Sequence, residues 1–109
     1  MFFNQTTYTT GTNPSSVAVV DVNNDNKPDI IVANANSYSV SVLLNNGNGT
    51  FLTQITYTTG ASSSPSSVAV VDVNSDNKPD IIVGNGGLAN VGVLLNSGSG
   101  SSCLIRLRI

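Results

Sequence analysis

The 109-residue chain contains an internal repeat with an offset of 51 residues. The sequence PSSVAVVDVNNDNKPDIIV at residues 14–32 returns at residues 65–83, where 18 of the 19 residues are identical and Ser75 replaces Asn24. A fixed period of this length is typical of solenoids, propellers and arrays, in which each repeat buries one face on its neighbour. The repeat therefore predicts two copies of one small structural unit.

Each copy has the pattern of short β-strands separated by turns. Residues 16–22 and 29–34 carry β-branched and aliphatic side chains on both faces, as expected of inner strands. Residues 39–45 show a clearer alternation of polar and apolar side chains than the two inner strands. The Asn-Gly pairs that follow them suit a hairpin turn. Residues 51–58 are more polar and suit an outer strand. No segment has a helical period, so we expect an all-β fold built from four-stranded antiparallel β-propeller blades.

The repeat also predicts boundaries along the chain. FFNQTTYTTG near the N-terminus matches FLTQITYTTG at residues 51–60, so we expect the chain to open on an outer strand. After residue 101 the match ends. The expected units are an outer strand at 2–11, a first blade at 15–60 and an incomplete second blade at 66–101, which together make a repeat region at 1–101, and a divergent tail at 102–109 that could form a strand.

The second blade needs a fourth strand, for which the sequence offers two sources. One is the tail CLIRLRI, and the other is the N-terminal strand. Two blades are also too few for a ring, because propellers have about 4–8. We therefore expect a partial or open propeller that self-associates or belongs to a longer array, or else two sheets that fold onto each other as a sandwich.

The acidic residues are concentrated in two loops. All six are Asp, three in each copy of DVN(N/S)DNKPD, and the chain has no Glu. Alternate positions of a tight loop can bring oxygens to one point, as a hard cation with 6 to 8 oxygen ligands requires. Carboxylates clustered in this way repel one another unless a positive charge lies between them. The candidate ligands are Asp21, Asn23, Asp25, Lys27 through its carbonyl, and Asp29, and in the second copy Asp72, Asn74, Asp76, Lys78 and Asp80.

The same loop residues also fit structures other than a calcium site. Asp and Asn are good turn residues, so the loop could simply cap its own backbone. The all-oxygen ligand set favours Ca²⁺ over Zn²⁺ or Cu²⁺, and Mg²⁺ is the nearest competitor. An EF-hand is excluded because its twelfth position, normally a bidentate Glu, is Val32 or Val83. We expect a left-handed backbone at Asn26 and Asn77, and dissociation constants of about 10⁻⁴ to 10⁻³ M.

Composition argues against other function classes. The net charge is −2 with four Lys and Arg residues, so we expect no nucleic-acid binding. The absence of His removes the commonest general base, and we expect no enzymatic activity. No apolar run is long enough to span a membrane, and no signal peptide is visible at the N-terminus. Any export signal is expected to lie outside this sequence.

The stretch SSVAVVDVNNDNKPDIIVANANSYSVSVLLNNGNGTF resembles the FG-GAP/VCBS repeat of integrin-α-type β-propellers. In that family a D-x-[DN]-x-D-G-x-x-D loop binds Ca²⁺ between the first two strands of a blade. The resemblance covers about residues 2–101 and implies the ligand set given above, with one Ca²⁺ per repeat. This sequence departs from the pattern at Asn26 and Asn77, where the family usually has Gly, and in the SGSGSS turn, which lacks its Phe.

The resemblance also implies a function. We expect a non-catalytic, calcium-binding module for extracellular recognition or cell adhesion, with a glycan or a protein as its ligand. The alternative is a non-catalytic fragment of a polysaccharide-binding or polysaccharide-lyase propeller. Asn4 and Asn48 begin sequons, which could be glycosylated if the protein is secreted.

Overall fold

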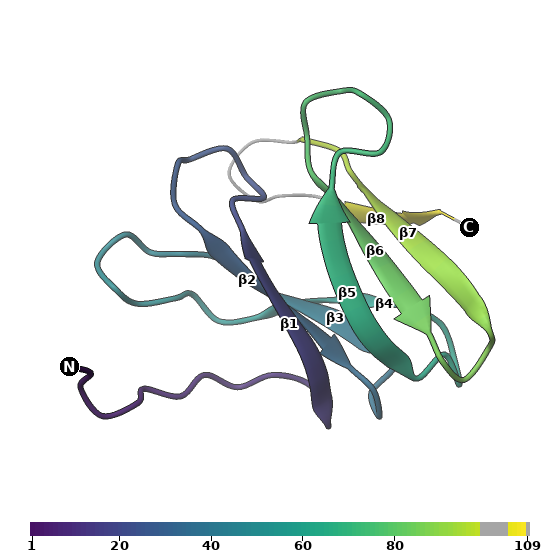
Figure 1. Cartoon of the computed structure of the whole chain (residues 1–109), viewed down its shortest axis with the longest axis horizontal. Helices are drawn as coiled ribbons and strands as arrows, with labels where there is room; N and C mark the ends of the chain where they lie inside the picture. The colour runs from purple at the N-terminus through teal and green to yellow at the C-terminus, as the bar shows by residue number, and fades with distance from the viewer. Residues whose placement is uncertain (99–104, 109) are drawn as a thin grey trace.

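The computed structural model describes residues 1–98 and the backbone of residues 105–108. These residues form two four-stranded antiparallel sheets, each a meander in chain order (Figure 1). The first sheet contains β1 (Pro14–Val20), β2 (Asp29–Asn34), β3 (Ser39–Leu43) and β4 (Ile55–Thr58). The second contains β5 (Pro65–Val71), β6 (Asp80–Asn85), β7 (Asn90–Asn96) and β8 (Ile105–Arg108). The predicted all-β class is confirmed.

The two copies of the repeat fold with the same strand register. Val20 pairs with Asp29 in the first sheet, and Val71 pairs with Asp80 in the second. The first strand of each sheet has an irregularity directly after its initial proline. Proline is tolerated there because the strand lies at the edge of its sheet, where one side of the backbone needs no ladder hydrogen bond. Near-identical sequence thus gives near-identical local geometry.

The hydrophobic core lies between the two sheets. We call the side of each sheet that carries Val17 or Val68 its front face, and the opposite side its rear face. The core joins the rear face of the first sheet to the front face of the second. The rear face contributes Ala18, Val20, Ile31, Ala33, Val40, Val42, Ile55 and Tyr57, and the front face contributes Val68, Val70, Ile81, Val83 and Leu94.

The inner edges of the sheets are also joined. β1 and β5 lie side by side (Figure 1), and the Ser15 hydroxyl donates a hydrogen bond to the carbonyl oxygen of Pro65 at 2.9 Å. The same hydroxyl lies 3.2 Å from the carbonyl oxygen of Ala33 in its own sheet. The interface is therefore built from apolar packing and at least one polar contact between the first strands of the repeats.

The expectation of an outer strand at residues 2–11 is wrong. The structure places no strand in residues 1–13. The outer edges of the sheets are held by β4 and β8, so neither described sheet leaves this segment an outer edge. Instead, the ring of Tyr8 packs edge-to-face on Phe51, with centroids 5.6 Å apart, and the Tyr8 hydroxyl accepts a hydrogen bond from the Phe51 N–H.

The second sheet takes its fourth strand from the tail. β8 pairs antiparallel with β7, from Val93 opposite Arg108 to Asn96 opposite Ile105. Of the two sources that the sequence offered, the structure uses the C-terminal one. The remaining parts of the predicted boundaries, residues 99–104 and 109, lie outside the described residues. Among those described, no helix is long and apolar enough to cross a membrane.

Candidate metal-binding loops

Both aspartate-rich loops leave the same end of the two sheets (Figure 1). The first joins β1 to β2, and the second joins β5 to β6. In the first loop, Asp21 directly follows β1, Asp29 is the first residue of β2, and Asp25 lies between them. The paired strands hold the two ends of each loop together, so carboxylates that are eight residues apart in sequence converge.

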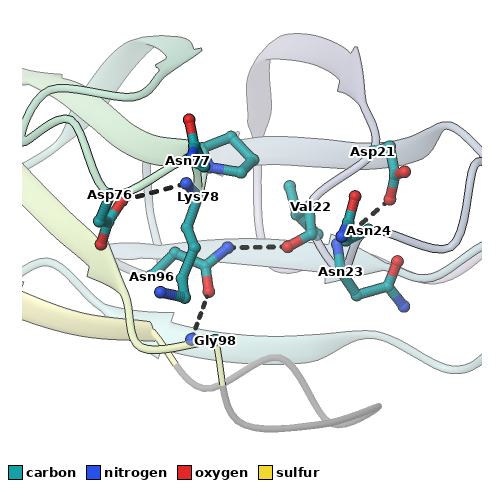
Figure 2. A pocket seen from close by; sticks show the side chains of 10 residues that line it. Asp21, Val22, Asn23, Asn24, Asp76, Asn77, Lys78, Asn96 and Gly98 are labelled. Atoms are coloured by element: carbon teal, nitrogen blue, oxygen red, sulfur yellow. Dashed lines mark hydrogen bonds between the residues drawn. The ribbon is translucent and has the colours of Figure 1, made fainter.

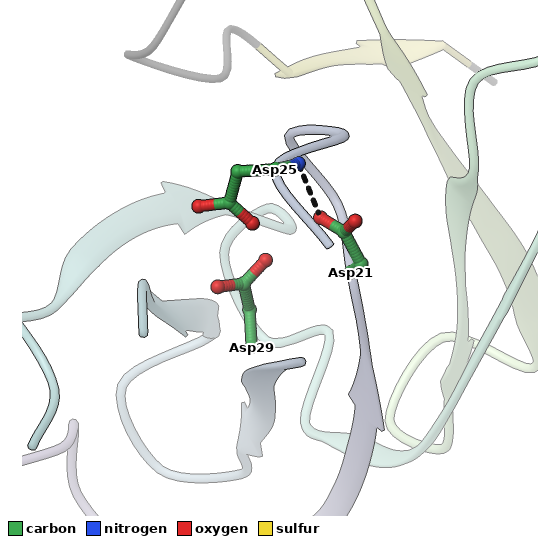
Figure 3. Close-up of side chains that lie close together, drawn as sticks. All are labelled: Asp21, Asp25 and Asp29. Carbon is green, nitrogen blue, oxygen red and sulfur yellow. Dashed lines mark hydrogen bonds between the residues drawn. The ribbon is translucent and has the colours of Figure 1, made fainter. Parts of the chain in front are cut away.

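The structure brings the three carboxylates of each loop together. One carboxylate oxygen from each of Asp21, Asp25 and Asp29 can be chosen so that all three lie within 4.8 Å of one another (Figure 3). The same holds for Asp72, Asp76 and Asp80. Each group could hold a metal ion, since such a cluster supplies hard anionic oxygens around one point. Six of the predicted ligands thus converge as two matching triads.

Asp21 organises the first loop through its carboxylate. Its Oδ1 accepts hydrogen bonds from the backbone N–H groups of Asn23 and Asp25, at 3.2 and 3.3 Å, and its Oδ2 accepts one from Asn26 at 2.8 Å. Asp72 makes the equivalent three bonds, at 3.2, 3.3 and 2.9 Å. The turn interpretation of these residues is therefore also correct, and it is compatible with a metal site because each carboxylate has further lone pairs.

The loop backbone is left-handed at two positions in each copy. Asn26 and Asn77 have φ of 65° and 64°, as predicted from the sharp turn. Asn24 and Ser75 have φ of 62° and 60°, which the sequence analysis did not predict. The one substitution between the two aspartate-rich loops therefore falls at a residue that is exposed but conformationally restricted. Asn tolerates this conformation better than Ser does, because its side chain can bond locally.

Asp29 and Asp80 are fully buried and tie each loop to a neighbouring turn. Asp29 accepts a hydrogen bond from the Val22 N–H at 2.9 Å and one from the Asn45 N–H at 2.8 Å. Asp80 accepts the equivalent bonds from Val73 at 2.9 Å and Asn96 at 2.8 Å. A buried carboxylate needs such donors, and here they connect the aspartate-rich loop to the turn after the third strand of the same sheet.

The local environment shifts the pKa of three carboxyl groups. Partial desolvation raises the pKa of Asp21, but donors from the backbone of Asn26, Asp25, Asn23 and Asn24 outweigh it and bring the pKa below the ordinary value. The same balance lowers the pKa of Asp72. Burial raises the pKa of Asp29 above the ordinary value despite its two backbone donors, and the negative charges of Asp25 and Asp21 add to this. A cation in the first loop would relieve that repulsion.

The amide of Asn23 points into the carboxylate cluster. One of its terminal atoms lies 3.0 Å from Asp21 Oδ1 and 3.0 Å from Asp25 Oδ1. In the second copy, the corresponding distances from Asn74 are 3.0 Å to Asp72 and 2.9 Å to Asp76. If that atom is Nδ2, it donates to both carboxylates, which suits the metal-free loop. If the amide is turned over, its oxygen becomes a further ligand for a cation between the carboxylates.

Lys27 and Lys78 each interact with the site through the main chain. Their N–H groups donate to Asp25 and Asp76 at 3.0 Å. Their aliphatic carbons lie against Gly47 and Gly98 of the following turn, where a Cβ would come within 3.1 and 2.1 Å of the lysine Cε. Both glycines also have positive φ, 96° and 72°. The role of the two lysine carbonyl oxygens as ligands stays a prediction.

Two functional residues were missed by the sequence analysis. Asn45 and Asn96, which are equivalent by the 51-residue offset, each donate a backbone N–H to the buried Asp of their repeat. Each also accepts, at its Oδ1, the N–H of the glycine two residues later, at 2.8 and 2.9 Å. Their recurrence just before a Gly-rich turn was the available signal, and it was interpreted only as a hairpin.

The space between the two loops forms a cavity of about 290 Å³ (Figure 2). One side is lined by the first loop, including Asp21, Asn23 and Asn24, and the other by Asp76, Asn77 and Lys78 of the second. Asn96 lies at the floor and donates to the carbonyl oxygen of Val22 across the gap (Figure 2). The two candidate metal sites are therefore neighbours on one surface.

Comparison with known proteins identifies one family. The family model for the FG-GAP-like repeat matches residues 21–83, which is more than half of the chain. The match begins at the first aspartate of the first loop and ends after the second loop. Searches of curated proteins and of solved structures found no match.

Proposed function

Because the chain belongs to the FG-GAP-like repeat family, we propose that it is a calcium-binding β-propeller module with one Ca²⁺ in each aspartate-rich loop. Its role is recognition or adhesion outside the cell, without catalysis. The observation that carries this proposal is the convergence of three carboxylates and one amide in both copies of the loop. The ligands we assign to the ions are those predicted from the sequence.

The donor chemistry favours calcium over other ions. Every side-chain ligand is a hard oxygen, and neither loop contains His or Cys. Calcium takes oxygen ligands at about 2.3–2.6 Å in a flexible arrangement, whereas Mg²⁺ demands a compact octahedron at about 2.0–2.1 Å. A loop that supplies four side-chain oxygens and further backbone oxygens suits the larger ion. Weak binding of about 10⁻⁴ to 10⁻³ M is typical of extracellular modules and fits an extracellular setting.

The ion is proposed to act structurally. Each loop carries three negative charges at short range, and one of them, on Asp29 or Asp80, is buried. A divalent cation would neutralise the cluster and fix the loop that lines the cavity between the repeats. The surface formed by the two ordered loops is then the part of the module best placed to contact a glycan or a protein.

Thermal unfolding tests the structural role of calcium. We expect the melting temperature of the protein to rise as Ca²⁺ is added after treatment with a chelator, because an ion that binds only the folded state stabilises it. Mg²⁺ at the same concentration should give a smaller shift. A melting temperature that is insensitive to Ca²⁺ would remove the support for both sites.

A further inference from the structure

The front face of the first sheet exposes residues whose repeat equivalents are buried. Val17 is 62% exposed, whereas Val68 in the second sheet is 9% exposed. Val19 is 63% exposed, and its equivalent Val70 packs against the core. The sequence around them is the same, so the difference arises because the first sheet covers the front face of the second, while no described sheet covers the front face of the first.

The rear face of the second sheet also exposes residues whose equivalents in the first sheet are covered. Val91 is 57% exposed, whereas its equivalent Val40 in the first sheet is fully buried. Val71 is 55% exposed, and its equivalent Val20 packs against the core. Here too the side chains are those that another sheet covers inside this molecule. The described part of the molecule thus has an exposed apolar patch at Val17 and Val19 on one side and another at Val71 and Val91 on the other, whereas Val32 and Leu43 of the front face of the first sheet are 6% and 2% exposed.

In the first three strands of each sheet, the two partly exposed faces have almost the composition of the two faces that form the core. At every front-face core position the first sheet has the same residue as the second. In the first three strands the rear faces differ only where Gly84 replaces Ala33, but the outer strands differ, because Val42 pairs with Ile55 in β4 and its equivalent Val93 pairs with Arg108 in β8. The equivalent front-face pairs are Val17 and Val68, Val19 and Val70, Ile30 and Ile81, Val32 and Val83, and Leu43 and Leu94. The rear-face pairs are Ala18 and Ala69, Val20 and Val71, Ile31 and Ile82, Ala33 and Gly84, Val40 and Val91, and Val42 and Val93.

We infer that copies of this chain associate head to tail, with the rear face of the second sheet of one copy packed on the front face of the first sheet of the next. The packing inside the chain shows that these two kinds of face are complementary over their first three strands, because nearly the same residues already form the core there. A second copy is therefore the occupant for which the molecule provides a template. Burial of this apolar surface supplies the driving force.

Polar groups at the faces are placed for the same contact. Ser15 donates to Pro65 across the internal interface, and its equivalent Ser66 is exposed and donates to the Gly84 carbonyl in its own sheet, at 3.4 Å. In the head-to-tail contact, Ser66 would donate to the carbonyl oxygen of Pro14 in the next copy. Asn96 also donates to the Val22 carbonyl between the two sheets. In the head-to-tail contact, its equivalent Asn45 would donate to the carbonyl oxygen of Val73 in the preceding copy.

The N-terminal segment covers the outer part of the front face of the first sheet. Tyr8 matches Tyr57 of β4 in the alignment of the two outer-strand sequences. Tyr57 packs on the core that contains Leu94, and residues 7–9 lie in the same groove as Leu43, the equivalent of Leu94. The segment therefore covers Leu43 where the outer strand of a preceding sheet would lie, and in the head-to-tail contact it would meet β8, which holds that edge in the preceding copy. Phe2 and Phe3, which precede it, are 98% and 100% exposed.

A head-to-tail interface uses two different surfaces, so it forms a ring if the rotation between copies closes and a filament if it does not. Each copy supplies two sheets, and propellers contain about 4–8 blades, so about two to four copies would close a ring. Together with the proposed function, this would give a complete propeller assembled from short chains. The association itself depends only on the two faces and does not require calcium.

Sedimentation of complementary face variants tests the inference. Val17→Asp with Val19→Asp blocks the front face, and Val71→Asp with Val91→Asp blocks the rear face. We expect the unmodified chain to sediment as a multiple of 11.2 kDa and each double variant to sediment as a monomer of about that mass. An equimolar mixture of the two variants should form a dimer and nothing larger, because it retains one intact interface.

Controls separate this outcome from misfolding and from other contacts. Leu88→Asp changes an exposed apolar residue in the turn before β7 and should leave the assembly unchanged. Circular dichroism checks the fold, and Val→Thr at the same positions provides a β-branched substitute if an Asp variant does not fold. A monomeric unmodified chain across the accessible concentrations, or a rear-face variant that dimerises alone through its front faces, would overturn the inference. Sedimentation is measured both with calcium and with chelator. Because association does not require calcium, assembly in chelator would support the inference even if neither loop binds the ion.

Discussion

Asn96 donates a hydrogen bond from its Nδ2 to the carbonyl oxygen of Val22 at 2.7 Å, across 74 positions of sequence. Asn96 ends β7 in the second sheet, and Val22 follows Asp21 in the aspartate-rich loop of the first. Asn45, the equivalent of Asn96, donates instead to Pro28 of its own loop at 2.9 Å. One buried amide therefore couples the candidate metal site of the first repeat to the core of the second.

Replacing Asn96 by Ala should destabilise the protein more than replacing Asn45 by Ala. Both variants lose an amide that also accepts the N–H of a nearby glycine, but only Asn96→Ala loses the bond between the sheets. We expect an additional cost of about 1 kcal/mol from a buried hydrogen bond. Urea unfolding measures the difference, best in the front-face variant, where association does not contribute. Equal losses would contradict the coupling.

The acid stability of the metal-free protein should depend on Asp21 and Asp72. Their pKa values are lower in the folded state than the ordinary 3.8, so their contribution is present above that value and is lost as the pH falls through the folded pKa. In chelator, the free energy of unfolding should therefore decrease on acidification below about pH 4. Asp21→Asn should flatten this decrease in urea unfolding series.

Asp29 should have the opposite effect on the acid stability of the metal-free protein. Its pKa is raised in the folded state, so its contribution is present below the unfolded value and is lost as the pH rises through the folded pKa. Asp29→Asn should consequently make the loss of stability in acid steeper, even though it also weakens two backbone hydrogen bonds. Unfolding of both variants over the same pH series provides the check. A change of slope in the same direction for Asp21→Asn and Asp29→Asn would contradict this account.

Much of this architecture follows from local sequence. The strand segments were predictable because β-branched runs such as DIIV alternate with Asn-Gly and Asp-rich turns. The convergence of Asp21, Asp25 and Asp29 was predictable because a loop closed by two paired strands must bring its ends together. The left-handed backbone at Asn26 was expected for the same reason.

Other features depend on contacts that sequence does not encode locally. The N-terminal segment resembles β4 but forms no strand, because an outer strand needs a free sheet edge, and β8 holds the edge of the second sheet. The tail that forms β8 matches nothing else in the chain, so its role was one of two alternatives. The bond from Asn96 to Val22 depends on how the two sheets pack, which the repeat pattern alone does not specify.

The left-handed position at Asn26 should tolerate glycine but not alanine. With φ at 65°, a Cβ without local hydrogen bonds costs about 1–2 kcal/mol, whereas Gly adopts this conformation freely. We expect Asn26→Ala to destabilise the protein by about 1 kcal/mol relative to Asn26→Gly. Both variants remove the same amide, so the difference in chemical denaturation isolates the backbone strain. Equal stability of the two would show that the loop relaxes to another conformation.

The amide of Asn23 should contribute directly to calcium binding. Its terminal atom lies within the carboxylate cluster, whereas the neighbouring Asn24 is exposed. We expect Asn23→Ala with Asn74→Ala to weaken calcium affinity about tenfold, corresponding to loss of one ligand of about 1.4 kcal/mol. Asn24→Ser gives the first loop the sequence of the second and should leave affinity within about twofold. Fluorescent competition for calcium measures both, and a larger effect of Asn24→Ser would reverse the assignment.

Calorimetric titration of the folded protein with Ca²⁺ tests the central claim most directly. The account predicts two sites per chain, with dissociation constants of about 10⁻⁴ to 10⁻³ M, and no binding heat after Asp25→Ala with Asp76→Ala. These substitutions remove one carboxylate from each triad and leave the buried Asp29 and Asp80 in place. Binding heat that persists in the folded double variant, or none in the unmodified protein, would contradict the account.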